Sequence, residues 1–402
     1  MNFETFYSWV RDLPIVDWHN HLDLAALAED KPLGSLYEVW VKADPYKHRA
    51  MRICGEAERV ITGDAVEDEK WAAWTRTLPK LVGNPVFAWA KMEMEWLGID
   101  GCENISLSGW TPAKMLRKFN VEYCDPGYRM NADDAPDLSA MESVHVRGGR
   151  VLDISVDDVS RLSTFSSQLS TVAAFAVAHG WTMLLHMGAM RETSARLRAA
   201  AGPAGGFAGM RSPVDPAAVA AFLNALEVMP NCFGHKEQEK QKTVANSTRS
   251  TCSTRLNNPV HNSLPRTILM SLNPEAHASL AVLAGSFNGE GMPGKVQLGP
   301  AWWWCDHAEG IRDVLEKNAA YGVLSTFVGM TTDSRSLLSF VRHDYFRRIL
   351  CKWVAEKVAS GAFPSDESLL RPMLENICYR NAHDMVNHVE HVDHVKSLPV
   401  ST

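Results

Sequence analysis

The sequence lacks the cysteine pattern of a thiolate metal site or a redox centre. Its eight cysteines are scattered along 402 residues and none form C-x-x-C, so neither a cysteine zinc knuckle nor a dithiol redox motif is present. Their density does not suggest a disulfide scaffold, and a reducing cytoplasm is the compartment we expect. A secretory signal and an apolar run long enough to span a membrane are also missing, so we expect no membrane partner.

An excess of positive charge is absent as well. The formal net charge is -7, which argues against a nucleic-acid-binding surface but leaves room for an anionic substrate in a local basic pocket. The hydrophobic content of 46% and the charged content of 22% are those of a soluble globular protein. A chain of this length forms one large barrel with insertions, or two to three domains.

Two histidines follow the first predicted strand. An apolar run at residues 13–16 leads into the motif His19-Asn20-His21. Because strand side chains alternate between faces, His19 and His21 lie on the same side of the chain. Two imidazoles so placed can clamp a metal ion, although the motif taken alone more often represents two surface histidines in a loop.

Strand-like and helical segments alternate from Val121 onward. This alternation favours a parallel sheet, and an α/β fold closed into a (β/α)₈ barrel of the TIM type is the architecture we expect. We count about seven strands and place the missing one before Val121. After the first strand, the others are predicted at residues 121–123, either 143–146 or 151–154, 182–185, 267–272, 295–298 and 324–329.

Helical and polar segments complete the predicted chain. A helical elaboration at about residues 23–120 follows the first strand, and a helical tail at 345–385 closes the barrel. The segment 234–263 is polar and poor in aliphatic residues, so we expect a surface insertion or disorder there. We assign residues 1–402 to one metal-dependent barrel domain.

Reactive side chains gather at the ends of the predicted strands, where the active sites of such barrels lie. The first strand ends in His19 and His21, and Asp333 follows the last strand. Because the first and last strands of a closed barrel pair, these three side chains become neighbours. Two neutral imidazoles and one carboxylate, with positions left open, suit Zn²⁺ or another divalent transition ion.

Three further side chains have both functional and structural interpretations. His186, at the end of the strand 182–185, is a further metal ligand, a substrate contact or a structural histidine. Arg335 either forms a structural salt bridge or captures a substrate carboxylate with its planar guanidinium. Arg191 has the same two interpretations.

Several longer motifs together resemble the uronate (glucuronate) isomerase family of the amidohydrolase superfamily. The stretch Val-Gly-Met-Thr-Thr-Asp-Ser-Arg-Ser at 328–336 is the most specific, and it is continued by Arg-His-Asp-Tyr-Phe-Arg-Arg at 342–348. The other matches cover nearly the whole chain and lie at residues 17–22, 46–52, 61–65, 186–191, 272–274, 294–299 and 302–303.

The resemblance implies an isomerase that interconverts D-glucuronate with D-fructuronate and D-galacturonate with D-tagaturonate. It implies one divalent ion, commonly Zn²⁺, held by His19, His21 and Asp333. We expect proton transfer through a cis-enediol while the metal polarises substrate oxygens, and we expect a homo-oligomer. The implied catalytic residues are Asp333, Tyr46 and Arg335, and the implied substrate-binding residues are Arg335, His186, Arg191, Trp302, Trp303 and Tyr46.

The chain also departs from the family pattern. Pro45 stands where the family usually has a histidine before the tyrosine, and a further strand-end arginine of the family has only a poor match here, at Arg147. Two alternatives therefore stay open, a mononuclear metal-dependent hydrolase of the same superfamily and a catalytically impaired uronate-binding homologue. The strand 267–272 leads to Asn273 with no histidine, which favours one metal ion over two.

Overall fold

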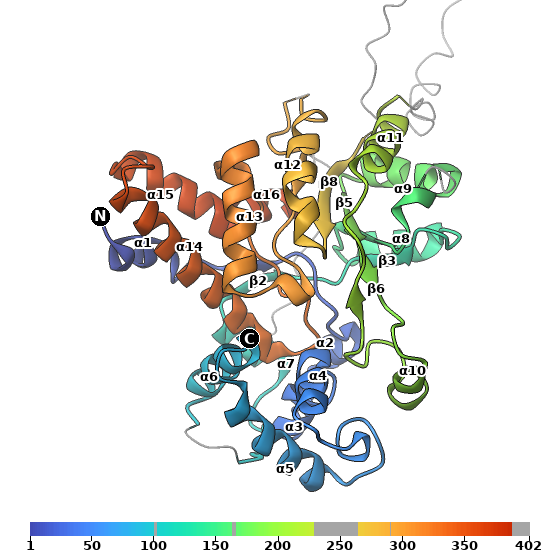
Figure 1. Cartoon of the computed structure of the whole chain (residues 1–402), viewed down its shortest axis with the longest axis vertical. Coiled ribbons are helices and arrows are strands. Elements are labelled where there is room, and N and C mark those ends of the chain that lie inside the picture. The colour runs from blue at the N-terminus through green and yellow to red at the C-terminus, as the bar shows by residue number, and fades with distance from the viewer. Residues whose placement is uncertain (100–102, 163–165, 229–263, 290, 388–402) are drawn as a thin grey trace, which may run out of the picture.

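The polypeptide folds into an α/β barrel built on short parallel strands, as the computed structural model shows (Figure 1). The structure describes residues 1–99, 103–162, 166–228, 264–289 and 291–387. The polar insertion predicted at 234–263 lies outside these ranges. No described helix is both long enough and apolar enough to cross a bilayer.

The barrel strands form two parallel ladders. The first ladder pairs β1 (Ile15–Asp17) with β2 (Val121–Cys124). The second has the order β3-β4-β5-β8-β9, and all of its neighbours are parallel. Its strands are β3 (Tyr128–Asn131), β4 (Val151–Val156), β5 (Thr182–Met187), β8 (Arg266–Ser271) and β9 (Val296–Leu298).

Chain continuity and polar contacts join the two ladders into a ring. Only residues 125–127 separate β2 from β3. On the other side, the Gln297 side chain of β9 accepts a hydrogen bond from Val328 N at 2.9 Å. The chain that follows runs beside the end of β1, where Asp333 N donates to His19 O at 3.2 Å and His21 N donates to Ser334 O at 2.8 Å. The two ends of the barrel therefore meet through these two backbone hydrogen bonds, although no strand ladder joins them among the described residues.

Three details of the strand prediction are wrong. The segment predicted as the last strand, 324–329, begins with the 3-10 turn Leu324–Thr326 and forms no ladder among the described residues. Residues 143–146 end the helix α8 (Leu138–Val146), so the alternative at 151–154 is the strand. The strand missing from our count is β3, after Val121 and not before it.

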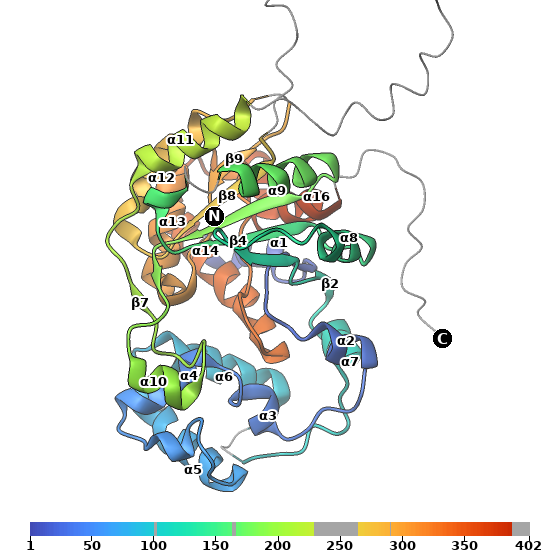
Figure 2. The same cartoon turned by 90° about the vertical axis from the view of Figure 1, so that its right-hand side faces the viewer.

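Helices surround the ring in chain order. From α9 to α14 each helix in this series packs against the next, and α1 (Phe3–Val10) packs on α14 and α15 (Figures 1 and 2). The series consists of α9 (Ser166–Ala178), α11 (Pro216–Glu227), α12 (His277–Gly285), α13 (Ala308–Tyr321) and α14 (Val341–Ala359), and the chain ends in α15 (Glu367–Glu375) and α16 (Asn381–Asn387).

The helices between β1 and β2 pack around a second hydrophobic core. Tryptophans and leucines of these helices pack together with Leu337–Val341 at the start of α14, so the helical stretch is fixed to the barrel. Its members are α2 (Leu24–Glu29), α3 (Leu36–Trp40), α4 (Pro45–Ile53), α5 (Glu67–Thr77), α6 (Pro85–Leu97) and α7 (Pro112–Lys118).

An arm extends from the barrel after β5 and ends on α4. It comprises the short antiparallel pair β6 (Ala189–Met190) and β7 (Gly209–Met210), with α10 (Ala195–Ala201) between them (Figure 2). Arg49 of α4 donates from Nη1 to Ala208 O at 3.2 Å. A Cβ on Gly206 would collide with the Pro45 carbonyl oxygen, so the arm and the first turn of α4 are in close contact.

Candidate metal centre and active site

A pocket of ≈ 610 Å³ opens at the carboxyl ends of the strands, between the barrel and the arm. This is where the barrel fold places reacting groups. All predicted site residues except His19 line it. The polar and aromatic side chains that line it include His21, Tyr46, Arg129, Asp153, Ser155, His186, Arg191, Trp302, Trp303, Asp333 and Arg335.

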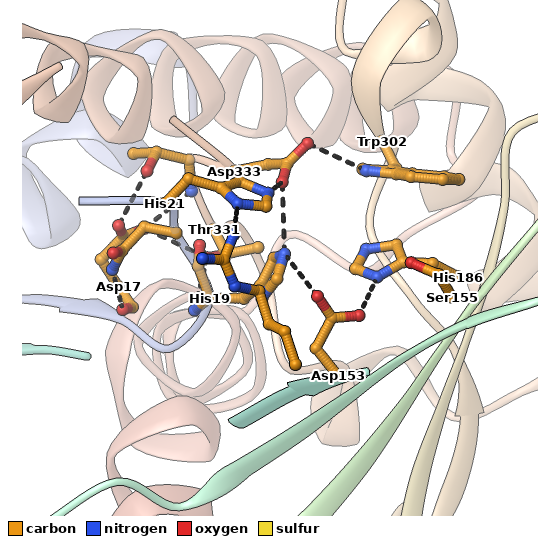
Figure 3. Close-up of polar contacts among 12 residues, drawn as sticks. Asp17, His19, His21, Asp153, Ser155, His186, Trp302, Thr331 and Asp333 are labelled. Carbon is orange, nitrogen blue, oxygen red and sulfur yellow. Dashed lines mark hydrogen bonds and ion pairs between the residues drawn. The ribbon is translucent and has the colours of Figure 1, made fainter. Parts of the chain in front are cut away.

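The predicted metal ligands meet at the edge of this pocket (Figure 3). Asp333 Oδ1 lies 3.2 Å from His19 Nε2 and 2.9 Å from His21 Nε2. The other oxygen of Asp333, Oδ2, accepts a hydrogen bond from Trp302 Nε1 at 2.9 Å. Strand alternation explains the histidine pair, and the return of the chain beside β1 explains the carboxylate.

The electrostatics of His21 and Asp333 suit a metal ion. Although burial lowers the pKa of His19, the neighbouring carboxylates of Asp153 and Asp333 raise it above its usual value. Burial raises the pKa of Asp333, but its hydrogen bonds to the two imidazoles hold it well below the usual value, so the carboxylate is ionised. Burial lowers the pKa of His21 to about 4, which leaves a neutral imidazole with a lone pair to offer. Neutral imidazoles and an ionised carboxylate are the ligands that Zn²⁺ takes in open, reactive sites.

A buried carboxylate at the end of β1 holds the segment that carries Asp333. Asp17, which is 0% exposed, accepts hydrogen bonds from Thr332 N at 2.7 Å, Thr332 Oγ1 at 2.7 Å and Thr331 Oγ1 at 3.1 Å. His343 Nε2 lies 3.1 Å from the same carboxylate. These bonds replace a strand ladder, and they support a backbone that puts Asp333 at φ 50°, in the left-handed region.

A second carboxylate–histidine pair lies beside the first group. His186 Nδ1 is 2.6 Å from Asp153 Oδ1, and Asp153 Oδ2 is 4.0 Å from His19 Nε2. Although burial raises the pKa of Asp153, His186 and His19 hold it below its usual value. His186 Nε2 is buried without a hydrogen-bond partner among the described residues, and the His186 ring lies 4.3 Å from that of Trp302, centre to centre.

Two overlapping groups of side chains could hold a divalent ion. One is His19, His21 and Asp333, and the other is His19, Asp153 and His186; within each group the candidate ligand atoms lie within 4.8 Å of one another. Sequence reasoning missed Asp153. The available signal was a charged residue inside the apolar run Val-Leu-Asp-Ile at 151–154, because a buried charge needs a partner.

In the part of the chain that the structure describes, four arginines line the pocket, Arg129, Arg191, Arg198 and Arg335. Arg191 donates from Nη2 to Ser155 Oγ at 2.7 Å and lies 6.0 Å from the centre of the Trp303 ring, whereas Arg335 is exposed on the rim. Arg129, on β3, contacts His21 Nδ1 and was missed because β3 was not predicted.

Arg147 does not reach the pocket. It caps the end of α8, and its Nε lies 3.9 Å from Asp125 Oδ2.

Tyr46 faces the pocket from the first turn of α4. Asp44 caps this helix by accepting hydrogen bonds from Tyr46 N at 2.8 Å and Lys47 N at 3.2 Å, and Pro45 fits the first helical position, where no amide hydrogen is needed. The Tyr46 ring is 5.3 Å from those of Trp89 and Trp304, both nearly perpendicular to it. Burial raises the pKa of Tyr46.

Comparisons with known proteins agree with one another. A family model described as glucuronate isomerase matches residues 1–106 and 234–386. A uronate isomerase of Caldicellulosiruptor bescii is 30% identical over 471 aligned residues, which cover 94% of this chain and 95% of that protein.

Solved structures share the fold. The crystal structure of uronate isomerase from Thermotoga maritima has a TM-score of 0.75 at 23% identity, with 96% of this chain and 97% of that one covered. The structure of glucuronate isomerase from Caulobacter crescentus has a TM-score of 0.69 at 16% identity, with 97% and 95% covered.

The family match divides the pocket into two parts. The matched ranges carry His19, His21, Tyr46, Trp302, Trp303, Asp333 and Arg335. The pocket residues that fall between them, at 107–233, include Arg129, Asp153, Ser155, His186 and Arg191, together with the arm.

Proposed function

Since this chain belongs to the glucuronate (uronate) isomerase family and is an isomerase, not a hydrolase, we propose how its pocket converts an aldo-hexuronate into the keto form. The reaction moves a proton between C2 and C1, D-glucuronate giving D-fructuronate and D-galacturonate giving D-tagaturonate. The observation that supports this assignment of the site is that His19 Nε2 and His21 Nε2 both approach one oxygen, Asp333 Oδ1, at the pocket edge.

The proposed ligands of a single divalent ion, Zn²⁺, are His19, His21 and Asp333. A bound divalent ion supplies Lewis acidity that polarises the substrate carbonyl and stabilises negative charge on its oxygens. The neutral state of His21 and the ionised state of Asp333 support this assignment. The second group shares His19 with the first, and we assign its Asp153 to orienting His186.

The arginines give the pocket its preference for a carboxylate. Arg335 on the rim and Arg191 over Trp303 are the groups we propose for binding the substrate carboxylate, because a planar guanidinium can donate two parallel hydrogen bonds to it. His186 and the tryptophans at 302 and 303 line the space between these arginines and the metal ligands, where they contact the sugar hydroxyls and carbon chain.

Proton transfer is assigned to Tyr46 and Asp333. One group removes the proton from C2, and the electron pair of that bond forms the cis-enediol; a proton is then returned to C1. Tyr46 lines the same pocket as Asp333, and Asp333 also assists opening of the sugar ring. Arg335 is close enough to His21 to affect its pKa, and we place it over the developing negative charge.

A coupled assay with glucuronate and galacturonate tests the function. We expect turnover that is lost with a chelator and restored by Zn²⁺ or Mn²⁺, and one equivalent of metal per chain in the purified protein. Binding of metal and uronate without turnover would contradict the proposed mechanism.

Exchange with solvent tests the proton carriers. In D₂O, deuterium enters the product of the wild-type enzyme, and we expect this exchange to fall in Tyr46→Phe and in Asp333→Asn. Unchanged exchange in both variants would remove the two residues as carriers.

We also propose a single cytoplasmic barrel domain that assembles into a homo-oligomer. Sedimentation analysis measures the assembly, and a second independent unfolding transition would contradict the single domain.

A further inference from the structure

A buried ion pair lies directly behind Tyr46. Arg342, in the first turn of α14, contacts Asp306, which follows the turn Trp303–Cys305 after β9. Both residues are only 2% exposed. The guanidinium carbon of Arg342 is 5.6 Å from the centre of the Tyr46 ring and 4.4 Å from the centre of the Trp89 ring, so it stacks against the aromatic wall of the site.

Burying this ion pair costs desolvation free energy that is not fully recovered. Arg342 Nε and Asp306 Oδ1 are both buried and have no hydrogen-bond partner among the described residues. A buried ion pair recovers its desolvation cost only when the remaining polar atoms are also satisfied, and apolar side chains of similar volume often stabilise a fold as well or better. Stability therefore does not explain why two charges stand here.

The charges around Tyr46 indicate what the pair does. Burial raises the pKa of Tyr46 most, and Asp333 and Asp44 raise it further, whereas Arg342 lowers it. Of these charged groups, Arg342 is the one cation, and it comes from α14, while Asp44 caps the tyrosine's own helix and Asp333 lies across the pocket. Asp44 has its own cation, since Lys47 Nζ lies 2.5 Å from Asp44 Oδ2. Without Arg342, no cation would remain among the charged groups that shift the pKa of Tyr46.

We propose that Arg342, held in place by Asp306, is a positioning residue for Tyr46. It stabilises the negative charge left on the phenol oxygen when Tyr46 gives its proton to the substrate. This role rests on the proton-handling function proposed for Tyr46. In that proton transfer the O–H bond of Tyr46 breaks and its electron pair stays on oxygen. The new C–H bond at C1 takes its electron pair from the C1–C2 double bond of the enediolate, whose C2–O⁻ becomes the carbonyl. In the reverse direction the phenolate takes a proton from the substrate carbon, so no other reactant is needed.

The geometry supports positioning as well as charge. The Trp89 and Trp304 rings meet Tyr46 at 89° and 80°, and Arg342 lies over the Trp89 ring. A guanidinium stacked on an aromatic ring and fixed by a carboxylate has little freedom to move. Because lysine has a compact ammonium instead of a planar fork, Arg342→Lys keeps the charge but loses the stacking.

Three variants separate charge from packing. Arg342→Lys retains a cation, Arg342→Met removes it, and Arg342→Met combined with Asp306→Leu replaces the pair by apolar groups and leaves no unpaired buried charge. The last variant keeps the test valid if Arg342→Met alone fails to fold, and thermal melts establish that each protein is native. The matched control is Arg312→Met, which breaks the exposed ion pair of Arg312 with Glu356 between α13 and α14 and should leave the kinetics within about twofold.

The measurement is kcat and KM as a function of pH on the metal-loaded enzyme. We expect Arg342→Met and the double replacement to lower kcat by about 10- to 100-fold, the usual effect of losing an outer supporting group, with KM little changed. The limb of the pH profile that reports Tyr46 should move to higher pH in both, because a phenol without its cation holds its proton more tightly. Arg342→Lys should restore the limb toward its wild-type position.

A double-mutant cycle with Tyr46→Phe completes the test. If Arg342 acts through Tyr46, its removal should add little to the loss already caused by Tyr46→Phe. A pH profile that coincides with the wild-type profile in a folded Arg342→Met enzyme, or losses that multiply in the cycle, would overturn the positioning role. Failure of the proposed function gives a different result, since the wild-type protein itself would then isomerise neither uronate.

Discussion

Replacement of Asp17 should weaken the metal centre without touching a metal ligand. The Asp17 carboxylate accepts three hydrogen bonds from Thr331 and Thr332, at 2.7 to 3.1 Å, and His343 provides a fourth contact. All four residues are buried. In Asp17→Asn one carboxylate oxygen becomes an NH₂ group, which cannot accept a hydrogen bond from Thr332, so the segment leading to Asp333 loses part of its support.

The magnitude follows from the number of bonds. A hydrogen bond to a charged group contributes about 1.5 to 3 kcal/mol, and four such bonds would exceed the 4 to 5 kcal/mol that single substitutions seldom pass. We therefore expect Asp17→Ala to lower the free energy of unfolding by about 4 kcal/mol. Asp17→Asn keeps one acceptor oxygen, and we expect it to lower the free energy of unfolding by about 2 kcal/mol. Because Asp333 moves with its segment, metal affinity should fall by about 10- to 100-fold.

Two assays separate these effects. Urea unfolding of the metal-free protein gives the free energy of unfolding, and competition with a chelator gives the metal affinity. Asp12→Asn is the control, because the Asp12 side chain is 83% exposed and pairs only with the neighbouring Arg11 among the described residues. An Asp17→Asn protein that is less stable but binds metal as tightly as the wild type would refute the reasoning.

Two further predictions concern α4 and the arm. Burial lowers the pKa of His48 to about 4. As the pH falls below about 6.5, the unfolded chain therefore binds a proton at His48 that the folded chain does not bind. The free energy of unfolding should fall by about 3 kcal/mol by pH 4. His48→Gln should remove that part of the dependence, measured by urea unfolding at several pH values, and an unchanged dependence would assign it elsewhere. Gly206→Ala forces a Cβ against Pro45 O at φ 82° and should raise KM for the uronate several-fold as the arm leaves α4. Gly202→Ala is the matched control, with φ 70° but open space around the added atom; equal effects in the two would mean that backbone strain, not the contact, is responsible.

The approach of the three proposed metal ligands was predictable because their geometry is local or follows from the meeting of the two ends of the barrel. His19 and His21 share a face by strand alternation, and Asp333 reaches them because the ends of a closed barrel meet. Asp153 was not predictable in the same way, since its role depends on His186 of the neighbouring strand and on the ladder register Asp153–Leu184. A hydrophobic pattern predicts that a strand is buried but not which polar side chain within it has a partner.

The strand errors have physical causes too. β3 begins directly after the sequence Asp-Pro-Gly at 125–127, which has the composition of a turn and hides the four-residue strand behind it. The last predicted strand has strand-like residues, but side chains replace its ladder. Asn381 donates to the Ser325 and Phe327 carbonyls, both at 2.8 Å, and Gln297 bonds Val328 N. Gly329, at φ 70°, packs too closely on Ile377 for a Cβ.

The outer wall of the pocket is built by a part of the chain that is separate from the proposed metal ligands. The family-matched stretches contribute the proposed metal ligands and Tyr46, whereas residues 107–233 contribute Arg129, Arg191 and the arm that forms the outer wall. Substitutions in the arm can therefore reshape the space for the distal end of a sugar acid while the proton-transfer residues stay in place. For anyone redesigning this enzyme toward a different acidic sugar, the arm and the arginines beside it are the region to diversify.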